Sequence, residues 1–178
     1  DAAKTAIAAD VKIILGPIFS SSAKAVAKVA LANNIPVVSF SNDKSLESSG
    51  IFTIGLMPEQ QINRVINFTI ENGTTDFTSL LPMDTYGEVV TKGLKEIASG
   101  HENVSILDNV TYRLDSNGRA IKLEKYTKLA FNIAMKKAAE RQVAMLMPSN
   151  SVITRQILNI LKNYNYDKSK ILLIGNDQ

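Results

Sequence analysis

Short apolar segments alternate with helix-like segments along almost the whole chain of 178 residues, and this alternation constrains the fold more than any other feature. The apolar segments end in turn or loop residues, as buried strands do. They lie at residues 11–15, 35–40, 51–54, 77–81, 104–107, 143–147 and 171–174. Helical periodicity marks residues 2–9, 23–30, 58–73, 88–98, 123–139 and 152–161. Because strands joined through helices form right-handed βαβ units, we predict an α/β fold with parallel sheets.

The first predicted strand runs directly into a turn of small residues. Gly16 and Pro17 open the turn, serines at positions 20–22 close it, and a helix with lysines on one face follows. The N–H groups at the start of such a helix point back at the turn, which suits an anionic or polar ligand group. In the alternative interpretation, Ser20 or Ser21 only caps the helix. The sequence leaves both roles open.

Composition argues against several classes of protein. The net charge is +3, from 20 basic and 17 acidic residues. The basic residues are scattered, and their densest group, Lys136, Lys137 and Arg141, fits a solvated helix end better than a nucleic-acid surface. No apolar run approaches the roughly 20 residues that a membrane span needs. The chain has no cysteine, which excludes disulfides and thiolate chemistry but does not fix the compartment.

Catalytic motifs are not apparent. The single histidine, His101, lies in a polar loop, where a solvated role is the simpler interpretation. The sequence has no Gly-x-Ser-x-Gly elbow, no Gly-x-Gly-x-x-Gly fingerprint and no P-loop. It also lacks carboxylates at the spacing of a calcium-binding loop. We therefore predict a binding protein rather than an enzyme, with no cofactor and no metal.

Several motifs resemble those of a known family. They are Leu15-Gly16-Pro17-x-x-Ser20-Ser21-Ser22, Ala25-Val26-Ala27, Ile35-Pro36-Val37-Val38-Ser39-Phe40-Ser41-Asn42-Asp43, Gly55-x-Met57-Pro58-Glu59-Gln60-Gln61 and Tyr86-Gly87. In order and spacing they resemble type I periplasmic binding proteins of the leucine/isoleucine/valine-binding branch. Three stretches resemble, more narrowly, those of bacterial penicillin-binding protein activators, which are envelope lipoproteins of this fold. They are Ser41-Asn42-Asp43, Pro58-Glu59-Gln60-Gln61 and the final Tyr166-Asp167-x-x-x-Lys170-x-Leu172-Leu173-Ile174-Gly175.

The resemblance implies a two-lobed fold of parallel sheets flanked by helices, closing over a ligand between the lobes. Residues 1–56 would be an incomplete lobe 1, residues 57–175 lobe 2, and residues 176–178 the start of the return crossover. An incomplete parallel sheet leaves apolar faces and edges uncovered. We therefore expect residues 1–56 to pair with another copy, as in a homodimer, or to belong to a longer chain.

The resemblance also implies ligand-binding residues in lobe 1. Ile18, Phe19, Ser20 and Ser21 match a turn that holds a ligand carboxylate in amino-acid-binding relatives. The segment Ser41-Asn42-Asp43 matches the loop that faces the ligand ammonium group there. Asp43 departs from the small and hydroxyl residues of those relatives: it could pair with a cation, but it would repel an ordinary carboxylate. Alternatively, Asn42 and Asp43 only form a turn with their own backbone.

Three further candidate ligand-binding residues match positions in lobe 2 of the family. Tyr86 matches a tyrosine that covers the ligand, and its alternative role is packing on the following helix. Ser149 follows the strand at residues 143–147, where helix capping by Ser149 or Asn150 is the stronger interpretation. Asp177 matches an acidic residue that holds the ligand ammonium group in some relatives.

Three hypotheses for function remain. The resemblance favours a regulator of peptidoglycan synthesis whose partner is a peptidoglycan synthase. The second is the substrate-binding protein of an ABC importer, with a permease as partner and an amino acid or similar small polar solute as ligand. The third is an α/β enzyme that uses the same cleft. The first two imply a location in the periplasm or cell envelope, with a lipid anchor upstream expected for the regulator.

Overall fold

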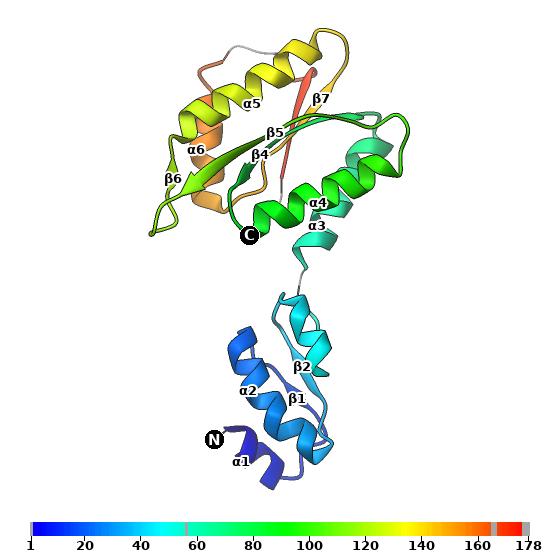
Figure 1. Ribbon diagram of the computed structural model, residues 1–178, viewed down its shortest axis with the longest axis vertical. Helices are drawn as coiled ribbons and strands as arrows, with labels where there is room; N and C mark the ends of the chain where they lie inside the picture. The colour runs from blue at the N-terminus through cyan, green and yellow to red at the C-terminus, as the bar shows by residue number, and fades with distance from the viewer. Residues whose placement is uncertain (1, 56, 165–166, 176–178) are drawn as a thin grey trace. The chain divides into compact units, whose positions relative to one another are not determined.

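The computed structural model describes residues 2–55, 57–164 and 167–175. The chain divides into two compact units, Asp1–Met57 and Pro58–Gln178 (Figure 1). The predicted α/β class is confirmed, because each unit builds a mainly parallel sheet with helices packed on it. No helix in the described part of the chain combines the length and the apolar character needed to cross a bilayer.

The first unit contains a three-stranded parallel sheet in the order β1-β2-β3. Its elements are α1 (Ala2–Ala8), β1 (Ile14–Leu15), α2 (Ser20–Ala30), η1 (Leu31–Asn33), β2 (Val37–Ser39), η2 (Lys44–Ser49) and β3 (Phe52–Thr53). Leu15 is in register with Val38, and Ser39 with Thr53, so the carboxyl ends of the three strands lie at one edge. This edge carries the loops that follow β1 and β2.

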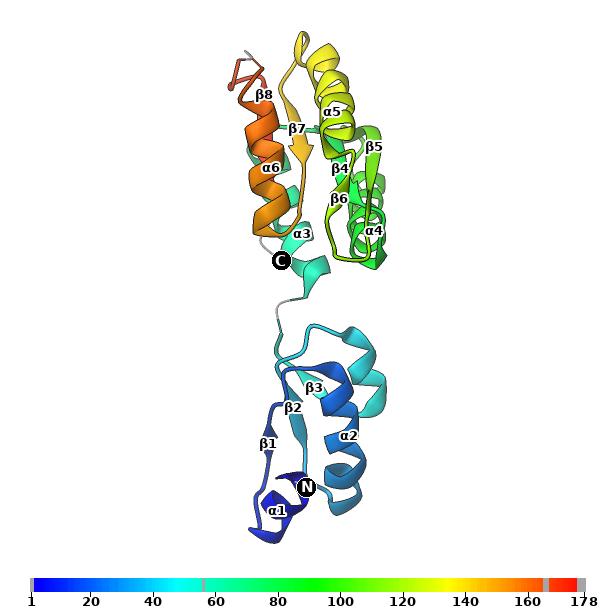
Figure 2. The same cartoon turned by 90° about the vertical axis from the view of Figure 1, so that its left-hand side faces the viewer.

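Small side chains let α2 pack closely on this sheet (Figure 2). Ala23, Ala27 and Ala30 recur at helical spacing on one face of α2 and are buried with Val37 and Leu46. Other apolar side chains of the unit are exposed, among them Ile13, Leu15, Phe52 and Ile54. The expected exposure of apolar side chains is therefore observed in this unit.

The second unit contains a five-stranded sheet in the order β6-β5-β4-β7-β8. Its elements are α3 (Pro58–Glu71), β4 (Asp76–Pro82), α4 (Thr85–Ser99), β5 (Ser105–Leu114), β6 (Ala120–Ile121), α5 (Leu123–Ala138), β7 (Val143–Leu146), α6 (Ser151–Leu161) and β8 (Ile171–Ile174). Strands β4, β5, β7 and β8 are parallel, and β6 pairs antiparallel with β5.

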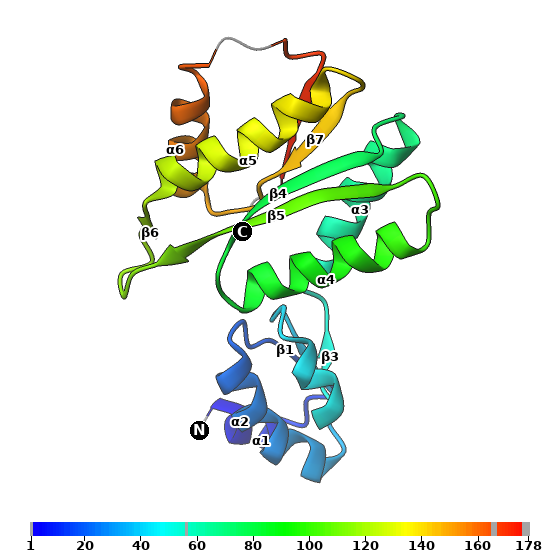
Figure 3. The ribbon, with the colours of Figure 1, turned by 45° about the horizontal axis from the view of Figure 1, so that its top comes forward.

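Helices cover both faces of this sheet (Figure 3). Alternate residues of β7 face opposite sides: Ala144 and Leu146 pack with α3 and α4, whereas Val143 and Met145 pack with α5 and α6. A strand that is buried on both faces reads as a continuous apolar run, which explains why β7 was predictable from the sequence.

Three details differ from the sequence-based expectations. Strand β5 was expected to end at residue 107 but extends to Leu114, because its second half alternates polar and apolar residues and buries Val110 and Tyr112. Strand β6 was not expected; it forms a hairpin with β5 through a turn in which Asp115 accepts the N–H groups of residues 117 and 119. The polar loop at residues 41–50 contains the 3₁₀ helix η2.

Candidate functional site

Backbone and side-chain hydrogen bonds join the loops that follow β1 and β2. The Pro17 carbonyl oxygen accepts from the Phe40 N–H at 3.1 Å and from the Ser39 hydroxyl at 2.7 Å, and the Gly16 N–H donates to the Val38 carbonyl oxygen at 2.7 Å. Gly16 has a φ of +105°, a conformation that side chains with a Cβ rarely adopt. The glycine therefore permits the sharp turn that brings the two loops together.

Helix α2 begins at this turn without a side-chain cap. Phe19 is the N-cap residue in extended conformation, and no side-chain hydrogen bond caps the helix. The interpretation of Ser20 or Ser21 as the cap is therefore wrong: Ser20 is the first helical residue. Ile18 and Phe19 are largely exposed. A helix start without a side-chain cap leaves its first N–H groups to water or to a ligand.

A series of hydrogen bonds runs along the loop after β2. The Ser41 N–H donates to the Ser39 hydroxyl, and the Asp43 N–H donates to the Ser41 hydroxyl, both at 3.1 Å. The Ser45 N–H donates to Asp43 Oδ1 at 3.0 Å, so Asp43 caps η2. The predicted turn at Asp43 is thus confirmed. Ser41 is buried and its hydroxyl is engaged within the loop, whereas Asn42 is exposed.

Asp43 brings the two loops of this edge into electrostatic contact. Its Oδ2 lies 4.0 Å from Nζ of Lys24, on the second turn of α2. Hydrogen bonds from Ser45, with smaller contributions from Ser20 and Lys24, hold the pKa of Asp43 below its usual value. Lys24 also donates to the Ser45 hydroxyl at 3.3 Å. The edge of the first unit therefore presents an ionised carboxylate beside the start of α2.

In the second unit, the predicted residues also follow the carboxyl ends of strands. Tyr86 lies in the first turn of α4, half-buried, and packs against the core between the sheet and α3 and α4. Ser149 is buried, and its hydroxyl lies 2.8 Å from that of Thr154. Asn150 caps α6 by accepting the Ile153 N–H at 3.0 Å, so of the two predicted caps Asn150 is correct. The remaining candidate, Asp177, lies outside the described residues.

Tyr112, which was not among the residues predicted from the sequence, lies near Ser149. Tyr112 is fully buried, and its hydroxyl makes no hydrogen bond of good geometry within the described residues. Burial, and then the negative charge of Asp84, raise the pKa of Tyr112 to about 12, with a partly offsetting effect of the Ser149 hydroxyl. The period-two alternation of residues 108–114 was the available signal for its burial.

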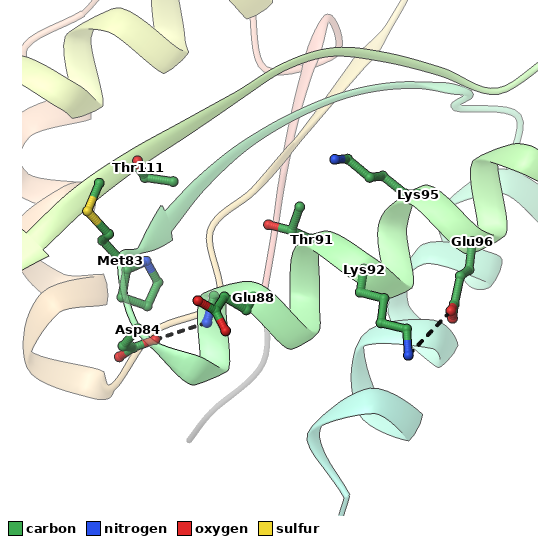
Figure 4. A pocket seen from close by; sticks show the side chains of 10 residues that line it. Met83, Asp84, Glu88, Thr91, Lys92, Lys95, Glu96 and Thr111 are labelled. Atoms are coloured by element: carbon green, nitrogen blue, oxygen red, sulfur yellow. Dashed lines mark hydrogen bonds and ion pairs between the residues drawn. The ribbon is translucent and has the colours of Figure 1, made fainter.

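A cavity of about 490 Å³ lies between α4 and the ends of β4 and β5 (Figure 4). Met83 and Thr111 lie at one end of it, and the ion pair of Lys92 with Glu96, at 3.7 Å, lies at the other. None of the predicted site residues lines this cavity. A second cavity of about 520 Å³ lies beside α6 and includes Ser149. The described residues contain no group of three metal-ligating side chains suited to a metal ion.

Gly87 fixes how α4 starts against β4. A Cβ at this position would lie 1.9 Å from the Pro82 carbonyl oxygen, so only glycine permits the close approach. The Asp84 carboxylate accepts the Gly87 N–H at 2.9 Å and caps the helix. The Tyr86-Gly87 motif therefore has a structural cause. The glycine lets α4 start close against the end of β4, and the tyrosine lies in the first turn of α4.

Comparisons with known proteins identify the family. The model of the receptor family ligand binding region matches residues 1–178. An uncharacterized protein of Rickettsia prowazekii is 27% identical over 175 residues, which cover 97% of this chain and 45% of the relative. This chain thus spans about half the length of that relative.

Solved structures share the fold at low sequence identity. A branched chain amino acid ABC transporter periplasmic ligand-binding protein from Burkholderia xenovorans is 12% identical, with a TM-score of 0.72, over 98% of this chain and 45% of that one. LpoA from Haemophilus influenzae is 14% identical, with a TM-score of 0.58, over 98% and 29% of the two chains. The fold is therefore that of type I periplasmic binding proteins. With a family match along its whole length, the chain belongs to the receptor family ligand binding region.

Proposed function

We propose that this chain is part of a non-enzymatic extracytoplasmic module that regulates peptidoglycan synthesis by binding a peptidoglycan synthase, as its resemblance to penicillin-binding protein activators implies. One observation favours this function over that of a solute receptor. Polar groups of the first unit that would face an amino acid are engaged within their own loop: the Asp43 N–H donates to the Ser41 hydroxyl at 3.1 Å, and the Ser45 N–H donates to Asp43 Oδ1 at 3.0 Å. A ligand-binding surface whose hydrogen-bond donors are already engaged within the protein has fewer of them available for a ligand.

On this proposal the two units correspond to parts of two lobes. Residues 1–56 belong to lobe 1 and residues 57–175 to lobe 2; residues 176–178, expected to start the return crossover, lie outside the described residues. The exposed apolar side chains Leu15 and Phe52 of the first sheet are then covered by the rest of lobe 1 or by a second copy. The proposed location is the periplasm or cell envelope, with a lipid anchor upstream.

A substrate-binding protein of an ABC importer is the second candidate. The absence of a side-chain cap on α2 favours it, since the helix start could donate N–H groups to a polar solute. The exposed side chains of Ile18 and Phe19 beside it would form an apolar wall. In that case Ser20 and Ser21 of the first unit would contact an amino acid or a similar small solute, and the partner would be a permease.

Binding experiments on the full-length protein separate the two functions. For the regulator, immobilised protein retains a purified peptidoglycan synthase from the same organism, and calorimetry against the twenty amino acids gives no saturable heat. For the receptor, one amino acid binds saturably and Ser20→Ala abolishes the binding, without retention of a synthase. Ser22→Ala, a neighbouring exposed serine of α2, is the control for both measurements.

A further inference from the structure

The positive charge of the chain is concentrated around α5. Residues 119–137 contain six basic residues and one acidic residue, which gives this segment a net charge of +5, whereas the whole chain carries +3. The rest of the chain is therefore slightly acidic. Charge of one sign that gathers in one region attracts partners of the opposite sign and steers them toward that surface.

Helical spacing sorts part of this charge onto one side of α5. Lys125, Leu129, Asn132 and Lys136 share the side that faces away from the sheet, opposite the residues of the helix that pack in the core (Figure 3). All four side chains are exposed, Leu129 to 47%. Lys122, which lies about one turn before Lys125, is exposed as well. We call these five residues the α5 outer face.

The lysines of the α5 outer face have no carboxylate beside them to neutralise their charge. Lys128 and Lys137, on the flanks of the helix, are paired with glutamates nearby in the sequence. In the part of the chain that the structure describes, Lys122, Lys125 and Lys136 form no ion pair. Lys125 Nζ instead lies over the ring of the next residue, 5.8 Å from its centroid. The face is therefore free to pair with carboxylates of another molecule.

Lys122 occupies a position where a lysine weakens the helix. It is the N-cap residue of α5, it makes no side-chain cap, and its φ of +52° lies in the left-handed region that residues other than glycine rarely adopt. Its charge, like that of Lys125 in the first turn, also stands at the positive end of the helix dipole. Asparagine would suit both the backbone and the cap better. A local arrangement that opposes the stability of its own element is typical of a binding site.

We propose that the α5 outer face is a docking surface for an acidic surface of a protein partner. The inference rests on the proposed function for the identity of that partner, a peptidoglycan synthase, and adds the surface and its chemistry. Lys125 and Lys136 pair with carboxylates of the partner, and Leu129 between them makes an apolar contact that excludes water. A membrane fits less well, because a helix that lies on lipid inserts its broad apolar face, and that face of α5 is buried in the core.

The test measures the affinity of the full-length protein for the purified synthase of the same organism by biolayer interferometry. Lys125→Glu combined with Lys136→Glu reverses two charges of the α5 outer face. The matched control, Lys28→Glu combined with Lys95→Glu, reverses two exposed lysines on α2 and α4. We expect the α5 variant to bind at least about 10-fold more weakly and the control to bind like the natural protein. Binding should also weaken as the salt concentration rises, since salt screens exposed charges.

A stability measurement separates binding from folding. Lys125→Glu places a carboxylate in the first turn of α5, where the helix dipole favours it, so weaker binding would not reflect a weaker helix start. Lys122→Asn is expected to unfold at a higher denaturant concentration than the natural protein, because asparagine suits the left-handed backbone and caps the helix. The same variant should bind the synthase more weakly. A purely structural role of Lys122 predicts no such loss.

Two outcomes on the synthase separate this inference from the proposed function. If the natural protein binds the synthase and the α5 variant binds it equally well, the docking surface is wrong and the proposed function stands. If the natural protein binds no synthase, the proposed function is wrong, and a photo-crosslinking experiment in cells decides the docking surface. Leu129→benzoylphenylalanine places the crosslinker on the α5 outer face, and Phe68→benzoylphenylalanine, an exposed position on α3, is the control.

A crosslink from position 129, but not from position 68, to a segment rich in Asp and Glu of another protein supports the docking surface. No protein crosslinked at position 129, or a crosslinked segment without acidic residues, overturns it. Binding of the natural protein to phosphatidylglycerol vesicles that the α5 charge reversal abolishes, without loss of a protein partner, would assign this face to a membrane and also overturn the inference.

Discussion

Arg141 holds the buried carboxylate of Asp76 through two nitrogen atoms, across 65 residues of the chain. Arg141 Nη2 donates to Asp76 Oδ1 at 2.9 Å, and Nε donates to Oδ2. Asp76 begins β4 and is fully buried, whereas the arginine lies between α5 and β7 and is half exposed. Two-point pairs of this kind are among the stronger charge-assisted hydrogen bonds. The pair ties the start of the central strand to the end of α5.

Replacing Arg141 with methionine should destabilise the second unit by about 3 kcal/mol, because the substitution leaves the Asp76 carboxylate buried without its partner. Denaturant unfolding of the natural protein and the variant measures the difference in free energy. Lys136→Met is the matched control: it removes an exposed cation from the same end of α5 and should cost less than about 0.5 kcal/mol. Equal costs for the two variants would show that Asp76 does not depend on the pair.

Gly87→Ala should prevent α4 from taking its observed position, since the new Cβ would lie 1.9 Å from the Pro82 carbonyl oxygen, a backbone atom that cannot rotate away. We expect a loss of at least about 2 kcal/mol in unfolding free energy. Gly100→Ala serves as the control, because its Cβ would meet atoms no closer than 3.5 Å and its backbone is in the right-handed region. A Gly87→Ala protein as stable as the Gly100→Ala protein would contradict the close approach.

The fold could be predicted from the sequence largely because its signals are local. A buried parallel strand such as β7 is a continuous apolar run, and alanines at helical spacing indicate α2. The second half of β5 has no such run, because polar residues alternate with the buried Val110 and Tyr112. Its length and its hairpin with β6 became clear only from the pairing.

The candidate site was predictable to the same extent. The turn at Asp43 depends on Ser45, two residues away, and the sequence indicated it. The contact of Asp43 with Lys24 depends on the register of β1 against β2, and the burial of Tyr112 near Ser149 depends on the order of strands in the second sheet. Arg141 shows the same limit: its neighbours in sequence suggested a solvated helix end, yet its partner is a buried residue far along the chain.

Tyr112 should keep its proton to a higher pH in the folded protein than a tyrosine ordinarily does. Its pKa of about 12 lies above the usual value of 10.0, so the folded protein keeps the proton to a higher pH than the unfolded chain does. The stability that this provides is complete below pH 10 and is lost as the pH rises toward 12. Absorbance of tyrosinate should show a late step that Tyr112→Phe removes, whereas Tyr126→Phe should keep it. A titration of the natural protein without that step would contradict the environment of Tyr112.

Asp43 should show the opposite dependence on pH. Hydrogen bonds from Ser45 and Ser20 favour its ionised form, so its pKa in the folded protein lies below the ordinary value of 3.8. The stability that the carboxylate gives η2 is therefore complete above about pH 4, where the unfolded chain is also ionised, and is lost as the pH falls through the lowered pKa. The backbone amide resonance of Ser45, which donates to Asp43, reports this step directly in an NMR titration. Asp43→Asn should abolish the step and Glu47→Gln should leave it in place. A Ser45 midpoint above 3.8 would mean that the carboxylate is not held by these donors.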